Sequence, residues 1–211
     1  MNIGVIDYGV GNVGSLISSL NELQINPITI CQAANINTVD KLILPGVGNF
    51  SDCIKILNED GWSQALSEYT QINNKSLLGI CLGMQLLATR SSEGSLGGIK
   101  NGALGLNLIP GYVENLRNLG CNLRTPHVGW NNVKICNESD ELFKSIQNNS
   151  DFYFVHSYAF LPDNLSHIIA TTDYDISITA AVRYKNIWGT QFHPEKSSKI
   201  GLQLLQNFIE S

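Results

Sequence analysis

The sequence predicts an α/β fold of three layers, in which helices cover a central, mostly parallel sheet that carries a small antiparallel extension. Before Arg90, short apolar runs of strand type alternate with segments of helical periodicity, as in parallel sheets. After Arg90 the pattern becomes less regular, and apolar residues alternate with turn residues from Leu104 to Gly111, which predicts short antiparallel strands. We interpret residues 1–211 as a single domain.

Composition indicates a compact globular protein. Hydrophobic residues make up 43% of the chain and charged residues only 15%, which excludes general disorder. The net charge of -5 argues against nucleic acid and anionic membranes as partners. The five cysteines are odd in number and lack zinc-ligand spacing, so we expect reduced thiols, a cytoplasmic location and no metal or other cofactor. No apolar run approaches the length of a membrane span, and no targeting segment precedes the first strand.

The N-terminal part predicts three strands, at residues 3–6, 27–30 and 41–44. The first strand leads through the glycine loop 7–12 into a helix with apolar residues Val13, Leu16, Ile17 and Leu20. The loop matches the glycine spacing of a dinucleotide fingerprint, but the acidic residue expected at the end of the second strand is missing. We therefore expect only a tight turn at this position.

The third predicted strand ends in Pro45-Gly46-Val47-Gly48, whose backbone could turn an N–H into the crevice beside Cys81. An ordinary strand-to-helix loop is the alternative. Ser51 is a plausible N-cap for the following helix, whose spacing predicts buried apolar residues at Ile54, Leu57, Trp62, Ala65, Leu66 and Tyr69.

The stretch Ser76–Leu87 predicts a nucleophile elbow with sulfur in place of a hydroxyl. A strand-like run enters Gly79-Ile80-Cys81-Leu82-Gly83, and helix-compatible residues follow without a loop. Gly79 and Gly83 give the turn the space it needs, and we expect the thiol to be exposed at its tip. A helix that begins at Leu82 would favour the thiolate. The alternative is a buried core cysteine between two incidental glycines.

Two polar segments, Thr125–Asn131 and Phe152–Tyr158, are expected to border a site. The first is too polar and turn-rich for a core, and the second is a strand that ends in polar groups. Their histidines, His127 and His156, are more typical of hydrogen-bonded structural residues than of catalytic ones. The remaining chain predicts strands at 168–171, 180–184 and 187–191, then a helix from Ser198 with Ile200, Leu204, Leu205 and Phe208 toward the core.

Between the last strand and this helix lies His193-Pro194-Glu195. Proline favours an extended conformation at the residue before it, so His193 and Glu195 are expected to point the same way. A carboxylate beside an imidazole fixes its tautomer, as a base that serves a thiol requires. A surface turn is the alternative. Cys81 and His193 would both lie at the carboxyl ends of strands, where α/β enzymes place their chemistry.

The Gly79–Gly83 and His193–Glu195 segments, in this order, resemble the class I glutamine amidotransferases over the whole chain. Residues 45–48, 126–131, 153–158 and 191–197 are more specifically similar to the glutaminase subunits of imidazole glycerol phosphate synthase. The resemblance implies a flavodoxin-like sandwich and hydrolysis of L-glutamine to L-glutamate and ammonia. It also implies a heterodimer with a barrel-shaped cyclase subunit, which uses the ammonia in histidine biosynthesis to form imidazole glycerol phosphate and aminoimidazole carboxamide ribotide.

The same resemblance implies roles for individual residues. Catalysis falls to Cys81, His193 and Glu195, and the oxyanion would be held by Leu82 and the Val47–Gly48 region. Residues implied to border the substrate glutamine are Gly46, Gln85, Glu93, Ser157 and Tyr158. Residues implied to lie toward the subunit interface are Asn12, Trp130, Tyr153 and Lys196.

Other functions stay open at this point. The linker from Gly98 to Arg124 looks unusual for a histidine-pathway enzyme, and close paralogues supply ammonia for amidination of surface-glycan sugars. A cysteine hydrolase or peptidase of the same architecture is a further alternative. A subunit without activity is disfavoured because every member of the triad is present.

Overall fold

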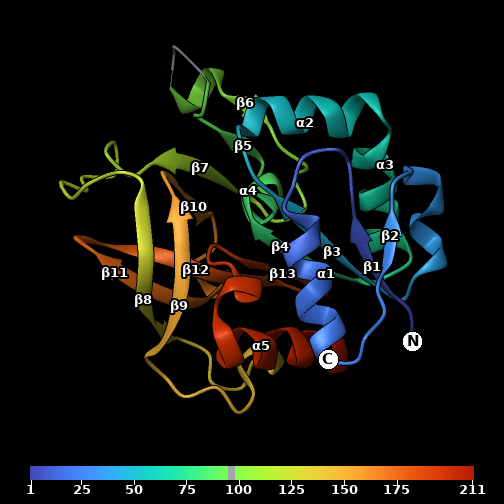
Figure 1. Ribbon diagram of the computed structural model, residues 1–211. Coiled ribbons are helices and arrows are strands. Elements are labelled where there is room, and N and C mark those ends of the chain that lie inside the picture. The colour runs from blue at the N-terminus through green and yellow to red at the C-terminus, as the bar shows by residue number, and fades with distance from the viewer. Residues whose placement is uncertain (95–97) are drawn as a thin grey trace.

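A nine-stranded sheet forms the centre of the computed structural model, which describes residues 1–94 and 98–211 (Figure 1). The strand order is β2-β1-β3-β4-β13-β12-β11-β8-β9. The first five strands in this order pair in parallel, as β2 (Ile28–Ile30), β1 (Ile3–Ile6), β3 (Lys41–Gly46), β4 (Ser76–Cys81) and β13 (Ile187–Thr190). The others continue the sheet in antiparallel pairing, as β12 (Ile176–Tyr184), β11 (Ile168–Tyr174), β8 (His127–Ile135) and β9 (Ser150–His156).

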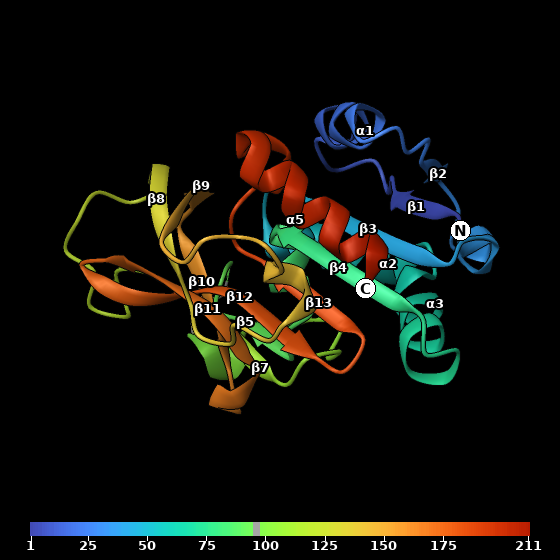
Figure 2. The same cartoon turned by 90° about the horizontal axis from the view of Figure 1, so that it is seen from below.

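Helices cover both faces of the parallel part and give it three layers (Figure 2). Alternate strand residues face opposite ways, so Leu42 packs in one core cluster and Ile43 in the other. The first cluster includes α2 (Phe50–Glu59), α3 (Trp62–Ser67) and α4 (Leu82–Leu86), and the second includes α1 (Val13–Glu22) and α5 (Ser198–Glu210). Figure 2 shows α1 and α5 together on one side of β3 and β4.

A second sheet, with strand order β10-β7-β5-β6, packs beside the first. Its strands are β5 (Arg90–Ser91), β6 (Ala103–Leu104), β7 (Gly111–Asn115) and β10 (Tyr158–Pro162). The pairing of β5 with β7 is parallel, whereas the other two pairings are antiparallel. Together with the four antiparallel strands of the large sheet, this makes the extension larger than the sequence predicts. Residues 95–97 of the glycine-rich stretch after Arg90 lie outside the described residues.

One local prediction was wrong. The cap of α2 is Asn49, whose side-chain oxygen accepts hydrogen bonds from the backbone N–H groups of Ser51 and Asp52, and Ser51 lies inside the helix. The prediction that Thr125–Asn131 lies outside the core is confirmed except at His127, which is buried where the segment enters β8 and begins to pair with β9. Pairing with a neighbouring strand overrides the turn-rich composition there. Among the described residues, no helix is both long and apolar enough to cross a membrane.

Candidate active site

Cys81 lies at the junction of β4 and α4, where the chain turns sharply. Its backbone has a φ of 54° and a ψ of -110°, a conformation that costs energy for a residue with a side chain. The neighbouring glycines allow this turn, because a Cβ on Gly83 would lie 1.9 Å from the Leu44 carbonyl oxygen and a Cβ on Gly79 would lie 2.7 Å from that of Gly83. The predicted elbow is therefore present. The thiol is not exposed at its tip, since Cys81 is only 7% accessible and opens onto a cavity.

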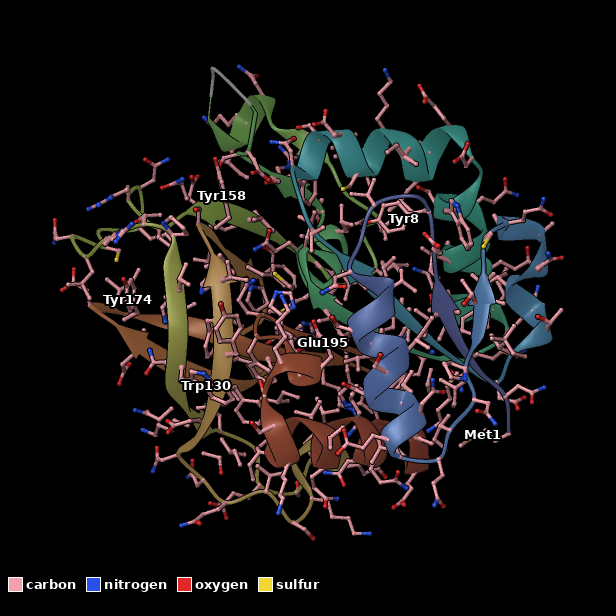
Figure 3. The ribbon with its side chains drawn as sticks, in the orientation of Figure 1. Met1, Tyr8, Trp130, Tyr158, Tyr174 and Glu195 are labelled. Carbon is pink, nitrogen blue, oxygen red and sulfur yellow. The ribbon has the colours of Figure 1, made fainter. Side chains whose placement is uncertain are left out.

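His193 and Glu195 form a buried pair at the carboxyl end of β13. The imidazole Nδ1 lies 2.7 Å from the carboxylate Oε1, and both side chains are about 4% exposed. His193 is extended as predicted, but Glu195 belongs to a 3-10 turn over Pro194–Lys196, which keeps the carboxylate within hydrogen-bond distance of Nδ1. Figure 3 labels Glu195 in this turn, just ahead of α5.

Hydrogen bonds hold the turn against the strand beside it. The Ser197 hydroxyl donates to the His193 carbonyl oxygen at 2.6 Å and accepts the Tyr153 backbone N–H at 3.0 Å. The His193 N–H donates to the Tyr153 carbonyl oxygen at 2.9 Å. The backbone of His193 is therefore tied to the turn and to β9, and its side chain lines the cavity.

The electrostatics of the site favour a charged imidazole. Burial lowers the pKa of His193, but contacts with Cys81 and Glu195 outweigh it and raise this pKa to about 9. The imidazole Nε2 has no hydrogen-bond partner among the described residues, and the Cys81 thiol instead donates to the Val155 carbonyl oxygen at 3.7 Å. Both side chains line the same cavity, which places the nucleophile and the base together.

The elbow and the base share one cavity of about 310 Å³. Nine of the site residues predicted from the sequence line it, and these are Val47, Gly48, Cys81, Leu82, Gln85, Glu93, Ser157, Tyr158 and His193. Gly46 does not line the cavity. A Cβ on Gly46 would lie 2.8 Å from the Gly83 nitrogen, so this residue packs directly against the elbow.

Gln85 and Glu93 present polar groups to this cavity. Gln85 Nε2 donates to the Tyr158 carbonyl oxygen at 2.9 Å, which leaves Oε1 as the free acceptor of this side chain within residues 1–94 and 98–211. The Glu93 carboxylate accepts the Phe50 N–H at 2.8 Å, at the start of α2. Burial raises the pKa of Glu93, and the hydrogen bond from Phe50 opposes that rise. Two acceptors thus line the cavity.

The residues expected at a subunit interface lie outside the cavity. Trp130 on β8 is 52% exposed, and its ring centroid lies 6.1 Å from that of Tyr153 on β9. Lys196 Nζ lies 5.9 Å from the Tyr153 ring centroid. Figure 3 labels Trp130 on β8, away from α1, whereas Asn12 caps the start of α1. Trp130, Tyr153 and Lys196 therefore form one contact group.

Sequence reasoning missed Gln191, whereas the hydrogen-bonded structural roles predicted for His127 and His156 are confirmed. Gln191 is fully buried and its Nε2 lies 3.9 Å from the Cys81 sulfur. His127 and His156 are paired, with Nδ1 of the first 2.9 Å from Nε2 of the second. Burial lowers the pKa of His127 to about 4 and that of His156 to about 3, so both are neutral. Position next to the His-Pro-Glu segment is the only sequence signal that points to Gln191.

Comparisons with known proteins find similar sequences over nearly the whole chain. The family model for glutamine amidotransferase class-I matches residues 4–211. The imidazole glycerol phosphate synthase subunit HisH of Pelagibacter ubique (strain HTCC1062) is 42% identical over 99% of both chains. Subunit HisH 1 of Prochlorococcus marinus (strain MIT 9313) is 45% identical over 97% of this chain and 95% of the relative.

Solved structures show the same fold at low identity. A crystal structure of a glutamine amidotransferase is 18% identical, with a TM-score of 0.74, over 100% of this chain and 98% of that one. The structure of PurLQS from Thermotoga maritima is 14% identical, with a TM-score of 0.77, over 99% of this chain and 97% of that one. These likenesses concern the fold alone.

Proposed function

The chain belongs to the class-I glutamine amidotransferases, and we propose that within this family it is the glutaminase subunit of imidazole glycerol phosphate synthase. The observation that carries the proposal is the cavity in which the elbow cysteine meets a buried His/Glu pair. Near-full-length similarity to HisH subunits supports the pathway. The reaction is hydrolysis of L-glutamine to L-glutamate and ammonia.

Three side chains carry the chemistry. The Cys81 thiolate attacks the carboxamide carbon of glutamine, and the charged His193 gives its proton to the departing nitrogen as ammonia leaves. The thioester that remains is hydrolysed by a water molecule, which loses its proton to the neutral His193. Glu195 accepts a hydrogen bond from the Nδ1–H of His193 and so keeps Nε2 directed at the reacting atoms.

Backbone N–H groups stabilise the tetrahedral intermediate. The N–H of Leu82 at the start of α4 and one from the Val47–Gly48 region would bind the oxyanion, and each donor contributes a few kcal/mol, about 3 in typical cases. Both segments line the cavity beside Cys81. The close packing of Gly46 on Gly83 supports this assignment, because it holds the loop against the elbow.

Substrate recognition is assigned to the other end of the cavity. Gln85 Oε1 and the Glu93 carboxylate are acceptors that suit the α-ammonium group of glutamine. The backbone of Ser157 and Tyr158 forms the facing wall. A cavity of about 310 Å³ fits an amino acid with an extended side chain, at the low end of the range for small-molecule sites. The chemistry uses only groups of the protein, so no cofactor is proposed.

The ammonia needs an acceptor. We assign it to a cyclase subunit of barrel fold that forms a heterodimer with this chain in the cytoplasm and makes imidazole glycerol phosphate. The exposed group of Trp130, Tyr153 and Lys196, together with Asn12, is the proposed contact surface. Exposed aromatic residues next to a cation are typical of interface anchors.

Cys81→Ala tests the function. The variant should lose glutamine-dependent activity by at least about 10³-fold in the complex with the cyclase while the fold and partner binding persist, since the elbow thiol contributes chemistry. Activity with added ammonium at high pH should remain. Glutamine-dependent turnover near that of the wild type would reject the proposal.

Complementation tests the pathway. Expression of this chain should restore growth of a histidine auxotroph that lacks its own glutaminase subunit, and Cys81→Ala should not. Failure of the active wild-type chain to complement would favour the alternative in which ammonia serves amidination of a surface-glycan sugar.

A further inference from the structure

Two buried side-chain amides connect the cavity to the nucleophile. Gln85 on α4 is 4% exposed and Gln191, after β13, is fully buried. Gln85 Nε2 donates to Gln191 Oε1 at 2.9 Å, and Gln191 Nε2 lies 3.9 Å from the Cys81 sulfur. The catalytic steps above use neither the Gln191 amide nor its contact with sulfur.

The orientation of both amides follows from a backbone carbonyl. The Tyr158 oxygen can only accept, so the Gln85 atom that lies 2.9 Å from it must be the nitrogen. The same Gln85 nitrogen faces Gln191, whose facing atom must then be the oxygen. The remaining Gln191 atom, directed at the Cys81 sulfur, is therefore an N–H donor.

Two histidines hold that carbonyl in place. His156 Nδ1 lies 2.9 Å from the Tyr158 oxygen and must donate to it, so His156 Nε2 is the acceptor of the His127 Nδ1–H. His127 stacks between Phe154 and Tyr174, with ring centroids 4.9 Å and 4.0 Å away. Both His156 nitrogens are engaged, which excludes this residue as the base for Cys81.

We propose that Gln191 is a further catalytic residue, which donates a hydrogen bond to the Cys81 sulfur and stabilises its thiolate. The inference rests on the proposed function for its role in turnover. Burial of an amide N–H without an acceptor is unfavourable, and the sulfur is the one partner of Gln191 Nε2 among the described residues. A thiolate accepts hydrogen bonds more strongly than a thiol, so the contact favours ionisation. Through Gln85, the same chain of hydrogen bonds ties the substrate-ammonium end of the cavity to the nucleophile.

The test is the pH dependence of Cys81 alkylation by iodoacetamide, followed by mass spectrometry to separate this cysteine from the other four. Gln191→Met keeps the length of the side chain and removes the donor. Alkylation at neutral pH should slow about tenfold, as expected for loss of a hydrogen bond to a charged group, while the plateau rate at alkaline pH stays unchanged. Gln32→Met, at an exposed position, is the control and should match the wild type.

An unchanged alkylation profile in folded Gln191→Met would overturn the proposal. If that variant fails to fold, the wild-type chain gives the answer through the side-chain N–H resonances of Gln191 in NMR spectra. They should shift with pH at the midpoint of Cys81 alkylation, and this shift should vanish in Cys81→Ala. Resonances that do not respond to Cys81 ionisation would overturn the proposal. Neither measurement uses glutamine, so each is independent of whether the chain proves to be a glutaminase.

Discussion

At the scale of single residues, three buried histidines differ in the direction of their pKa shift: the pKa of His193 is raised, whereas those of His127 and His156 are lowered. His193 contacts a carboxylate and a thiol, and its pKa rises to about 9 in spite of burial. His127 and His156 contact each other, and burial is the main cause that holds their pKa values low, with the nearby imidazoles of His127 and His193 adding to it for His156. Neighbours, rather than depth, therefore decide which imidazole is charged at neutral pH.

The pH profile of turnover should reveal the charge on His193. The folded protein raises the pKa of His193 from the usual 6.5 to about 9. The stabilisation by its imidazolium is therefore fully present below pH 6.5 and is lost as pH rises through about 9. Glutaminase kcat/KM should fall along the same alkaline limb. In Glu195→Gln the limb should move to lower pH, because the charge that favours the imidazolium is gone.

His193→Ala provides the comparison. It should lower kcat/KM by about 10²- to 10⁴-fold, whereas Glu195→Gln should retain more activity, since Glu195 orients the base and transfers no proton. Glutamate release across the pH range measures both variants. An alkaline limb that stays in place in Glu195→Gln would contradict the assigned origin of the raised pKa.

At the scale of elements, β3, β4 and α4 pack so closely that backbone touches backbone. A Cβ on Gly83 would lie 1.9 Å from the Leu44 carbonyl oxygen of β3. This oxygen belongs to the backbone, so it cannot move aside as the end of a flexible side chain could. Gly189 on β13 adds a further close approach, to Met84 of α4. The elbow thus depends on glycines from three neighbouring strands, which are Gly46 of β3, Gly79 of β4 and Gly189 of β13.

Gly83→Ala should therefore destabilise the fold by about 3 kcal/mol or more, because the clash can be relieved only by moving a strand. Gly14→Ala is the matched control, since its Cβ would meet nothing within 4 Å on α1. It should stabilise the protein by about 0.5 to 1 kcal/mol through helix propensity. Urea unfolding of both variants checks the difference, and equal midpoints would refute this account of the elbow.

At the scale of the whole molecule, the cavity exists only where distant segments meet. Val47 and Gly48 follow β3, Cys81 ends β4, Val155–Tyr158 joins β9 to β10 and His193 follows β13. The Val47 carbonyl oxygen accepts a hydrogen bond from the Cys53 thiol at 3.7 Å, so α2 holds one end of the loop. Gly48 has a φ of 102°, and among the described residues outside its own chain neighbours only Val10 lies within 4 Å of its Cβ position, which leaves its peptide room to turn.

We expect the isolated chain to be a poor glutaminase that the liganded cyclase subunit stimulates through this loop, because unregulated hydrolysis would release ammonia with no acceptor. Gly48→Ala should change that stimulation more than it changes KM for glutamine, since it restricts the loop peptide and its Cβ would come no closer than 3.8 Å to Val10. Gly46 is a poor choice for the test, as any side chain there would meet Gly83 of the elbow.

Gly61→Ala is the matched control for backbone strain, because Gly61 has a φ of 76° and open space around it at the start of α3. Both alanine variants should lose about 1 kcal/mol of stability, but only Gly48→Ala should alter stimulation. Steady-state glutamate release with and without partner and acceptor ligand measures the effect. The coupling hypothesis fails if the lone chain hydrolyses glutamine at a rate that neither addition raises.

The sequence alone determined the strands and helices of the parallel half, the elbow at Cys81 and the pairing of His193 with Glu195. It also determined the family, which the comparisons confirm. These features are encoded by residues adjacent in the chain: apolar periodicity, glycines at a tight turn, and a carboxylate two positions from an imidazole. Local patterns of this kind predict the same structure in different tertiary surroundings, because the local backbone geometry itself requires these residue types.

Only the tertiary structure decided the burial of the Cys81 thiol, the strand that begins at His127, the neutral histidine pair and the role of Gln191. Gln191 and Cys81 are 110 residues apart, and Gln191 and Gln85 are 106 apart. The direction of each hydrogen bond there follows from the Tyr158 carbonyl, which any residue type would supply. Burial and hydrogen-bond direction depend on which segments become neighbours, and that is settled by packing of the whole sheet rather than by any one stretch of the chain.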